Sequence, residues 1–161
     1  MKNREYLAFI IILIALDLSL HVGLGFGRGA PDLLTVAALL SARRLSGVKA
    51  SLVGLVLGLL ADSLALVSFG ASAVALVIVS FLGARTRDMF EGNSTLFIAA
   101  YLFLGKWLRD AIWFGAAPAA HAGDPINLLW TVTPLYALIT AVCGAIAISI
   151  FRAVVGERRM R

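Results

Sequence analysis

The sequence predicts an all-α integral membrane protein with six transmembrane helices in a single domain, residues 1–161. Of these 161 residues, 61% are hydrophobic and only 14% are charged, whereas about a quarter of a soluble domain is charged. The mean hydropathy is +0.96. Apolar segments recur along the whole chain, and ~20 residues of helix cross the ~30 Å hydrocarbon core of a bilayer. This composition excludes a soluble globule, a disordered chain and a collagen-like chain.

The first predicted span, 6–25, follows Lys2 and Arg4, and in this respect resembles a signal peptide. Asp17 interrupts the apolar run, and no A-x-A-like cleavage site follows it. We therefore expect a first helix that is retained. A glycine-rich turn at 23–29 separates it from the second span.

The second predicted span, 31–45, begins at Pro31, a favoured first position of a helix. Its apolar run fades near Ala42, so it must cross with little tilt, or extend past Arg43 with snorkelling side chains, or meet a locally thinner bilayer. The other apolar segments predict spans at 48–64, 70–84, 95–117 and 127–151.

Charge placement supports this short second span. With six spans and a cytoplasmic N-terminus, 11 of the 14 Lys and Arg residues lie inside, and both termini are cytoplasmic. Without the second span, ten of them lie outside, against the positive-inside rule. The residues placed inside are Lys2, Arg4, Arg43, Arg44, Lys49, Arg85, Arg87, Arg152, Arg158, Arg159 and Arg161.

The net charge of +5 and the pI of about 10.0 therefore indicate loops that face anionic lipid, and no nucleic acid. Cys143 is the single cysteine and there are two histidines, so neither an internal disulfide nor a zinc site is expected. The chain has no nucleophile elbow, zincin motif or P-loop. We expect no enzyme activity, no cofactor and no metal.

Three small or acidic residues follow a four-residue step in the third span: Gly54, Gly58 and Asp62. Two glycines four residues apart let another helix approach closely. One interpretation is a helix-packing seam in which Asp62 accepts hydrogen bonds from nearby backbone. The other is a carboxylate that contacts a partner protein.

Charged residues also lie inside the fifth span, where Lys106 and Asp110 are four apart and can pair on one helix face. Arg109 lies beside them and Trp113 follows. A charge at membrane depth costs at least ~2.5–3.5 kcal/mol, so these groups must face the bundle or a partner. They form either a buried ion pair or a polar interaction site for a second membrane protein.

Two further carboxylates lie near the start of the second span. Asp32 follows Pro31, where the positive end of the helix dipole favours a carboxylate. Asp17, in the first span, is harder to place; Ser19 and His21, which we do not expect to be a ligand, follow it. We expect Asp17 to pair with Lys106 or Arg109.

These residues resemble the rod shape-determining protein family MreD. The resemblance rests on Pro31-Asp32-Leu33-Leu34, the basic loop that follows, and Gly54-x-x-x-Gly58-x-x-x-Asp62. Phe69-Gly70 and Asp110 before Trp113-Phe114 also match. Two features depart from the family pattern: no glycine directly follows Asp62-Ser63-Leu64, and Lys106 and Arg109 form an atypical pair of cations.

The resemblance implies a non-catalytic subunit of the bacterial elongasome, the Rod complex, in the inner membrane. Its implied partners are the transmembrane helix of MreC, the glycosyltransferase RodA with its penicillin-binding transpeptidase, and MreB indirectly. The family is similar in fold to the substrate-binding components of energy-coupling-factor transporters. A vitamin-binding transporter component is therefore the main alternative, and an ion pathway a remote one, because its candidate residues are scattered over four helices.

Overall fold

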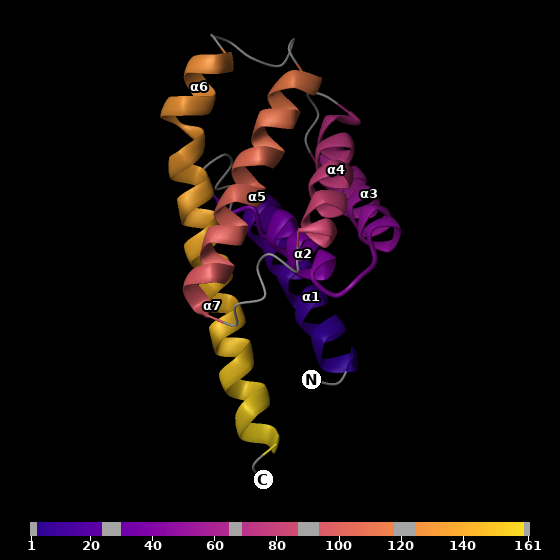
Figure 1. The fold of residues 1–161 in the computed structure, drawn as a ribbon, viewed down its shortest axis with the longest axis vertical. Coiled ribbons are helices and arrows are strands. Elements are labelled where there is room, and N and C mark those ends of the chain that lie inside the picture. Colours follow the sequence, from indigo (N-terminus) through magenta and orange to yellow (C-terminus); the bar gives the residue numbers. More distant parts are fainter. Residues whose placement is uncertain (1–2, 24–29, 65–68, 87–93, 118–124, 160–161) are drawn as a thin grey trace.

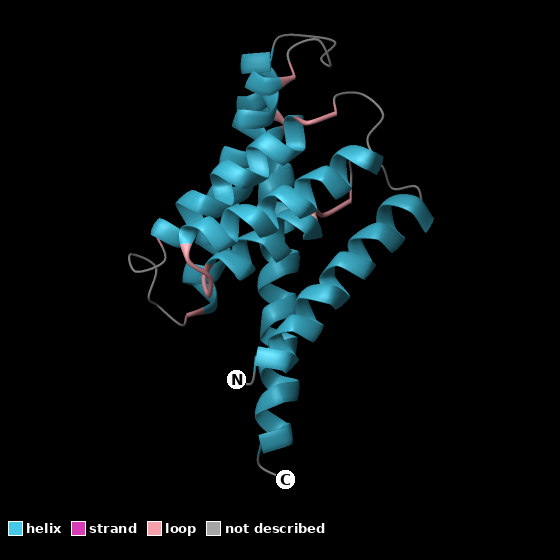
Figure 2. Cartoon of the chain, turned by 90° about the vertical axis from the view of Figure 1, so that its right-hand side faces the viewer, coloured by secondary structure: helices cyan, strands magenta, loops and turns pink. Residues whose placement is uncertain are grey.

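The computed structural model describes residues 3–23, 30–64, 69–86, 94–117 and 125–159. Within these ranges the regular elements are all helical, which confirms the all-α prediction (Figure 2). The elements are α1 (Asn3–Leu18), the π-helical turn η1 (Ser19–Gly23), α2 (Leu33–Ala42), α3 (Gly47–Leu64), α4 (Ala71–Arg85), α5 (Thr95–Ala116), α6 (Pro125–Thr131) and α7 (Thr133–Arg159).

Three helices differ from the predicted ranges. The first span, predicted at 6–25, is α-helical only to Leu18 and continues as the π-helical turn η1 to Gly23, while 24–25 lie outside the described residues. α2 ends at Ala42 and does not continue to residue 45; the N–H of Arg43 closes its last turn by donating to the carbonyls of Leu39 and Ser41. The last segment, predicted as one helix, is divided at Val132 into α6 and α7. Pro134 explains the break, because it has no N–H to donate to the carbonyl four residues before it.

α2 is the central helix of the bundle. All ten of its residues are buried, and α1, α3, α4, α5 and α7 all contact it. A helix that is apolar around its whole circumference is stable only when other elements surround it. The surrounding helices thus cover α2 on every side.

The outer surface of the bundle is rich in aliphatic side chains, whereas several charged groups are buried. Exposed examples are Leu7, Ile11 and Ile12 on α1, Leu52 and Val56 on α3, and Leu138, Val142 and Ile146 on α7. Asp17, Asp62, Lys106 and Asp110 are all buried. In the described part of the chain, the helical segments Gly47–Leu64 and Thr133–Val155 are long and apolar enough to cross a membrane.

The two ends of the chain lie at the same end of the bundle (Figure 1). α5 and α7 run antiparallel beside each other, and α3 and α4 form an antiparallel hairpin on the other side of α2. This arrangement brings the N-terminal ends of α2 and α4 toward the middle of α5, where the charged residues lie.

Candidate functional site

Four charged side chains meet where α5 passes the start of α2: Asp32, Lys106, Arg109 and Asp110. We refer to them as the charge cluster. Lys106 Nζ lies 2.5 Å from Asp110 Oδ1 and 3.4 Å from Asp32 Oδ2. A guanidinium nitrogen of Arg109 lies 3.0 Å from Asp110 Oδ1, and its Nε lies 3.9 Å from Asp32 Oδ2. The predicted pairing of Lys106 with Asp110 is confirmed.

Asp32 holds the start of α2 as well as the two cations. It is the N-cap residue, and its carboxylate accepts hydrogen bonds from the Thr35 N–H at 2.9 Å and the Thr35 hydroxyl at 2.7 Å. Its own N–H donates to Thr140 Oγ1 of α7 at 3.2 Å. The predicted placement at a helix N-terminus is confirmed, and this one residue links α2, α5 and α7.

Asp17 does not pair with Lys106 or Arg109, and that expectation is wrong. Its Oδ1 accepts hydrogen bonds from the N–H groups of Leu33 at 2.7 Å and Leu34 at 3.3 Å, in the first turn of α2. The first N–H groups of a helix have no partner within the helix and attract a carboxylate. Asp17 therefore joins α1 to the same helix start that Asp32 caps.

Asp62 likewise accepts hydrogen bonds from the first N–H groups of a helix, here α4. Its carboxylate accepts hydrogen bonds from the N–H groups of Gly70, Ser72 and Ala73 at 2.9 Å, 3.0 Å and 3.0 Å. The cap residue Gly70 has a left-handed φ of +99°, a conformation that favours glycine. The structure thus agrees with the interpretation in which Asp62 bonds to nearby backbone.

Arg109 connects the charge cluster to this second helix start. One of its terminal nitrogens donates to Ser72 Oγ at 3.2 Å, and Ser72 also donates its backbone N–H to Asp62. The N-terminal ends of α2 and α4 therefore converge on α5. Three carboxylates from α1, α3 and the start of α2 balance the partial positive charges of these ends.

The glycines of α3 form a close contact with α4. A Cβ added to Gly54 would overlap the Leu76 carbonyl oxygen and lie 2.6 Å from Ser80 Oγ. One added to Gly58 would overlap the Cα of Ala73 and lie 2.8 Å from its nitrogen. The predicted close approach of another helix is confirmed, and that helix is α4 of the same chain. This surface of α3 is covered within the fold.

Trp113 lies outside the charge cluster. It is half-buried, and its ring meets that of Phe114 edge to face with 5.6 Å between centroids. His21, which was not expected to be a ligand, lies in η1 with its Nδ1 3.3 Å from Asp17 Oδ2. The glycine-rich segment 24–29 and His121 lie outside the described residues.

Sequence reasoning missed the hydroxyl groups that complete this region: Thr35, Ser72 and Thr140. The first two lie at the N-cap-plus-three position of α2 and in the first turn of α4, so the helix starts could have indicated them. Thr140 lies 108 residues from its partner Asp32, and no spacing in the sequence connects the two.

The charge cluster contains two cations and two carboxylates, each in contact with an opposite charge. Within the described residues no group of three or more His, Cys, Asp or Glu side chains could hold a metal ion. This arrangement fixes helices relative to one another and offers no activated nucleophile. Comparisons of the chain with protein families, curated proteins and solved structures find no match.

Proposed function

We propose that this chain is a non-catalytic membrane scaffold of the bacterial elongasome, of the MreD type, which binds the transmembrane helix of MreC. The observation that carries the proposal is the convergence of the residues on which the resemblance rests. Asp32 and Asp110 belong to one charge cluster, and Asp62 is joined to it through Ser72 and Arg109. Motif residues far apart in the sequence thus serve one structural purpose.

A six-helix topology in the inner membrane, with both termini in the cytoplasm, belongs to this proposal. It is supported by the exposed aliphatic surface and by the two chain ends at one end of the bundle (Figure 1). The short α2 is compatible with it, because non-helical backbone at membrane depth is tolerated where protein surrounds it. The polar start of α2 is enclosed by α1, α5 and α7 through the contacts of Asp17 and Asp32.

The engagement of the charged groups favours a scaffold over the two alternatives. A solute-binding protein needs polar groups that converge on a ligand, and an ion pathway needs ionisable groups along one route. Here Asp17, Asp32, Asp62, Lys106 and Asp110 all bond to one another or to helix ends. Since α4 covers Gly54 and Gly58, MreC has to contact a different face from the one their spacing suggested.

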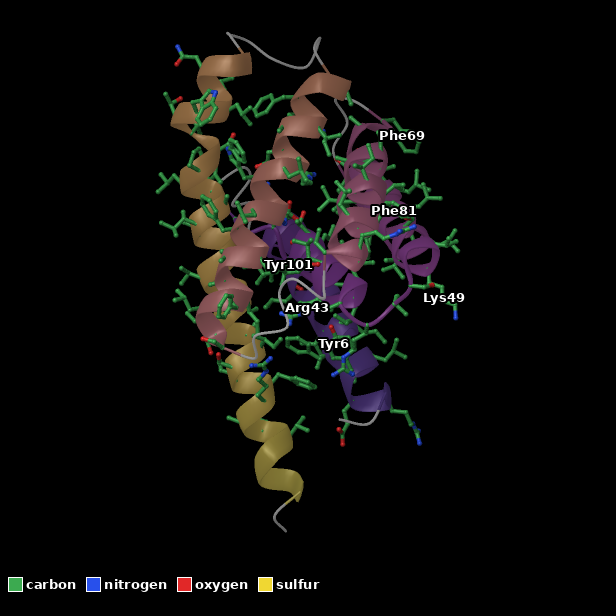
Figure 3. The ribbon with its side chains drawn as sticks, viewed as in Figure 1. Tyr6, Arg43, Lys49, Phe69, Phe81 and Tyr101 are labelled. Atoms are coloured by element: carbon green, nitrogen blue, oxygen red, sulfur yellow. The ribbon has the colours of Figure 1, made fainter. Side chains whose placement is uncertain are left out.

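Single-cysteine labelling tests the topology. Lys49 and Phe69 lie at opposite ends of the α3–α4 hairpin, and both are exposed (Figure 3). In a Cys143→Ser background, we expect a membrane-impermeant maleimide to label Phe69→Cys in intact spheroplasts and Lys49→Cys only after permeabilisation. Labelling of Lys49→Cys without permeabilisation would contradict a cytoplasmic N-terminus.

Affinity purification tests the function. The tagged chain, co-expressed with MreC, RodA and its transpeptidase, is solubilised in mild detergent, and proteins and small molecules are identified by mass spectrometry. We expect MreC to copurify in amounts comparable to the chain, and not with an unrelated tagged six-helix membrane protein. Recovery of cytoplasmic ATPase subunits or a stoichiometric vitamin, without MreC, would establish the transporter alternative.

A further inference from the structure

A second polar site lies at the end of the bundle that carries the chain termini, away from the charge cluster. It is a pocket of about 180 Å³ between α1, the C-terminal end of α2 and α7. Three arginines line it: Arg43, Arg44 and Arg152. The phenol of Tyr6 and the apolar side chains of Ile148 and Phe151 complete its wall.

Aromatic rings lie beside two of these arginines, Arg43 and Arg44. The guanidinium of Arg44 lies 3.8 Å from the centre of the Tyr6 ring. That of Arg43 lies 5.7 Å from the centre of the Tyr101 ring, and Figure 3 labels both of these residues. Both distances are in the range of cation–π attraction. The Tyr6 hydroxyl donates to the carbonyl of Leu40, so the ring beneath Arg44 is itself fixed to α2.

The far wall of the pocket is equally fixed. Phe151 stacks on Phe9 of α1 with 4.3 Å between ring centroids. This contact packs α7 against α1 at the residue that precedes Arg152. Side chains that are held before a ligand arrives lose less conformational entropy when it binds. The side chains of Arg43 and Arg44, and the helix position of Arg152, are thus fixed around one small volume.

The chemistry of this lining selects a phosphate group. Guanidinium groups bind phosphate oxygens through paired, charge-assisted hydrogen bonds. The volume is below the ~300–1,000 Å³ of pockets that enclose drug-sized ligands. It suits the charged part of a larger molecule whose remainder lies outside.

Exposed aliphatic side chains near the pocket indicate the chemical nature of the rest of the ligand. Leu7 and Ile150, the sequence neighbours of Tyr6 and Phe151, are 62% and 59% exposed on the outer surface. A ligand whose phosphate occupies the pocket would place its other end against this aliphatic surface. We infer that the pocket binds the phosphate of an anionic phospholipid, with the acyl chains lying along α1 and α7.

Lipid titration of the purified full-length chain in a non-ionic detergent tests this inference. Native mass spectrometry counts bound phosphatidylglycerol and, in parallel, bound phosphatidylcholine. We expect the wild-type chain to bind phosphatidylglycerol at least ~fivefold more tightly, since one arginine near an anionic lipid contributes a factor of about five. The double variant Arg44→Gln/Arg152→Gln should lose most of this preference.

Lys49→Gln is the matched control, because it removes one positive charge from an exposed side chain that points away from the pocket (Figure 3). It should leave the lipid preference within about twofold of wild type. Arg152→Lys, which keeps the charge, should fall between wild type and Arg152→Gln. Thermal aggregation of each variant in detergent identifies any that fail to fold, and the wild-type comparison of the two lipids requires no variant.

Three results would overturn the inference. The first is equal affinity of the wild-type chain for the two lipids. The second is an equal loss of lipid preference in Lys49→Gln and in the double variant. The third is saturation of the pocket by inorganic phosphate with no gain from a lipid tail, which would assign the site to a soluble anion.

Discussion

Replacing Asp32 by alanine is expected to lower the free energy of unfolding by about 3 kcal/mol, because it leaves the buried Lys106 and the partly buried Arg109 with one carboxylate. Lys106 loses a partner at 3.4 Å, and Arg109 one at 3.9 Å. Removing one partner of a buried ion pair usually costs ~3–5 kcal/mol. The low end of this range applies, since 19% of the Asp32 side chain is exposed. Unfolding by SDS titration in detergent micelles, followed by circular dichroism, measures the effect.

Two further variants separate the roles of Asp32 as an ion partner and as a helix cap. Asp32→Asn keeps the capping oxygen, and Asn is as good an N-cap as Asp. If the charge of Asp32 contributes more than its capping oxygen, both variants should lose most of the same stability. Their free energies of unfolding should then differ by about 1 kcal/mol or less, the approximate contribution of an N-cap. Adding Lys106→Met to Asp32→Ala should restore part of the loss, since it removes the uncompensated cation.

Ser63→Ala is the control, because its exposed hydroxyl bonds only within its own helix, to the carbonyl of Leu60. Its effect should stay within about 0.5 kcal/mol, as for most surface substitutions. A stability of Asp32→Ala equal to that of this control would contradict the role we assign to the charge cluster. It would mean that Asp110 alone balances Lys106 and Arg109.

The sequence predicts those parts of the fold that depend on neighbouring residues. The apolar runs gave most helix boundaries within a few residues, and the four-residue spacing of Lys106 and Asp110 predicted their pairing. Asp32 was correctly placed at a helix start, because that position follows from Pro31 alone. Each of these inferences depends only on local geometry.

Contacts between helices that are far apart in the sequence could not be predicted from residue spacing. The partner of Asp17 depends on how α1 crosses α2, and no spacing encodes that crossing. The spacing of Gly54 and Gly58 predicted a close helix contact, but not that α4 makes it. The pocket lined by three arginines was missed for the same reason: Arg44, just after α2, and Arg152 of α7 line one pocket only after these helices have packed.

Gly58→Ala is the second substitution with a large expected effect, and it distinguishes a packing seam from a partner-binding surface. The new Cβ would overlap backbone of Ala73, which cannot move aside as the end of a flexible side chain can. α3 and α4 must therefore separate. We expect a loss of about 1–3 kcal/mol in the free energy of unfolding, the usual cost of overpacking, measured by the same SDS titration.

Gly115→Ala is the matched control, since a Cβ at Gly115 of α5 meets nothing within 4 Å. Alanine has the higher helix propensity, by ~0.8–1 kcal/mol in a helix interior and less at this last turn of α5, so this variant should be as stable as wild type or more stable. Equal effects of the two substitutions would show that helix propensity, and not the contact with α4, determines the stability at Gly58.

Recovery of MreC, the partner we propose, from Gly58→Ala and Gly115→Ala tests the same distinction. If Gly58 serves folding, the amount of MreC recovered per folded chain should be unchanged in Gly58→Ala, although less folded chain is obtained. If Gly58 instead contacts a partner helix, the variant should keep wild-type stability and lose MreC. Because α4 already lies against Gly58, a partner helix could reach it only after the α3–α4 hairpin opened. Stable, folded Gly58→Ala without MreC would therefore require such an opening as part of assembly.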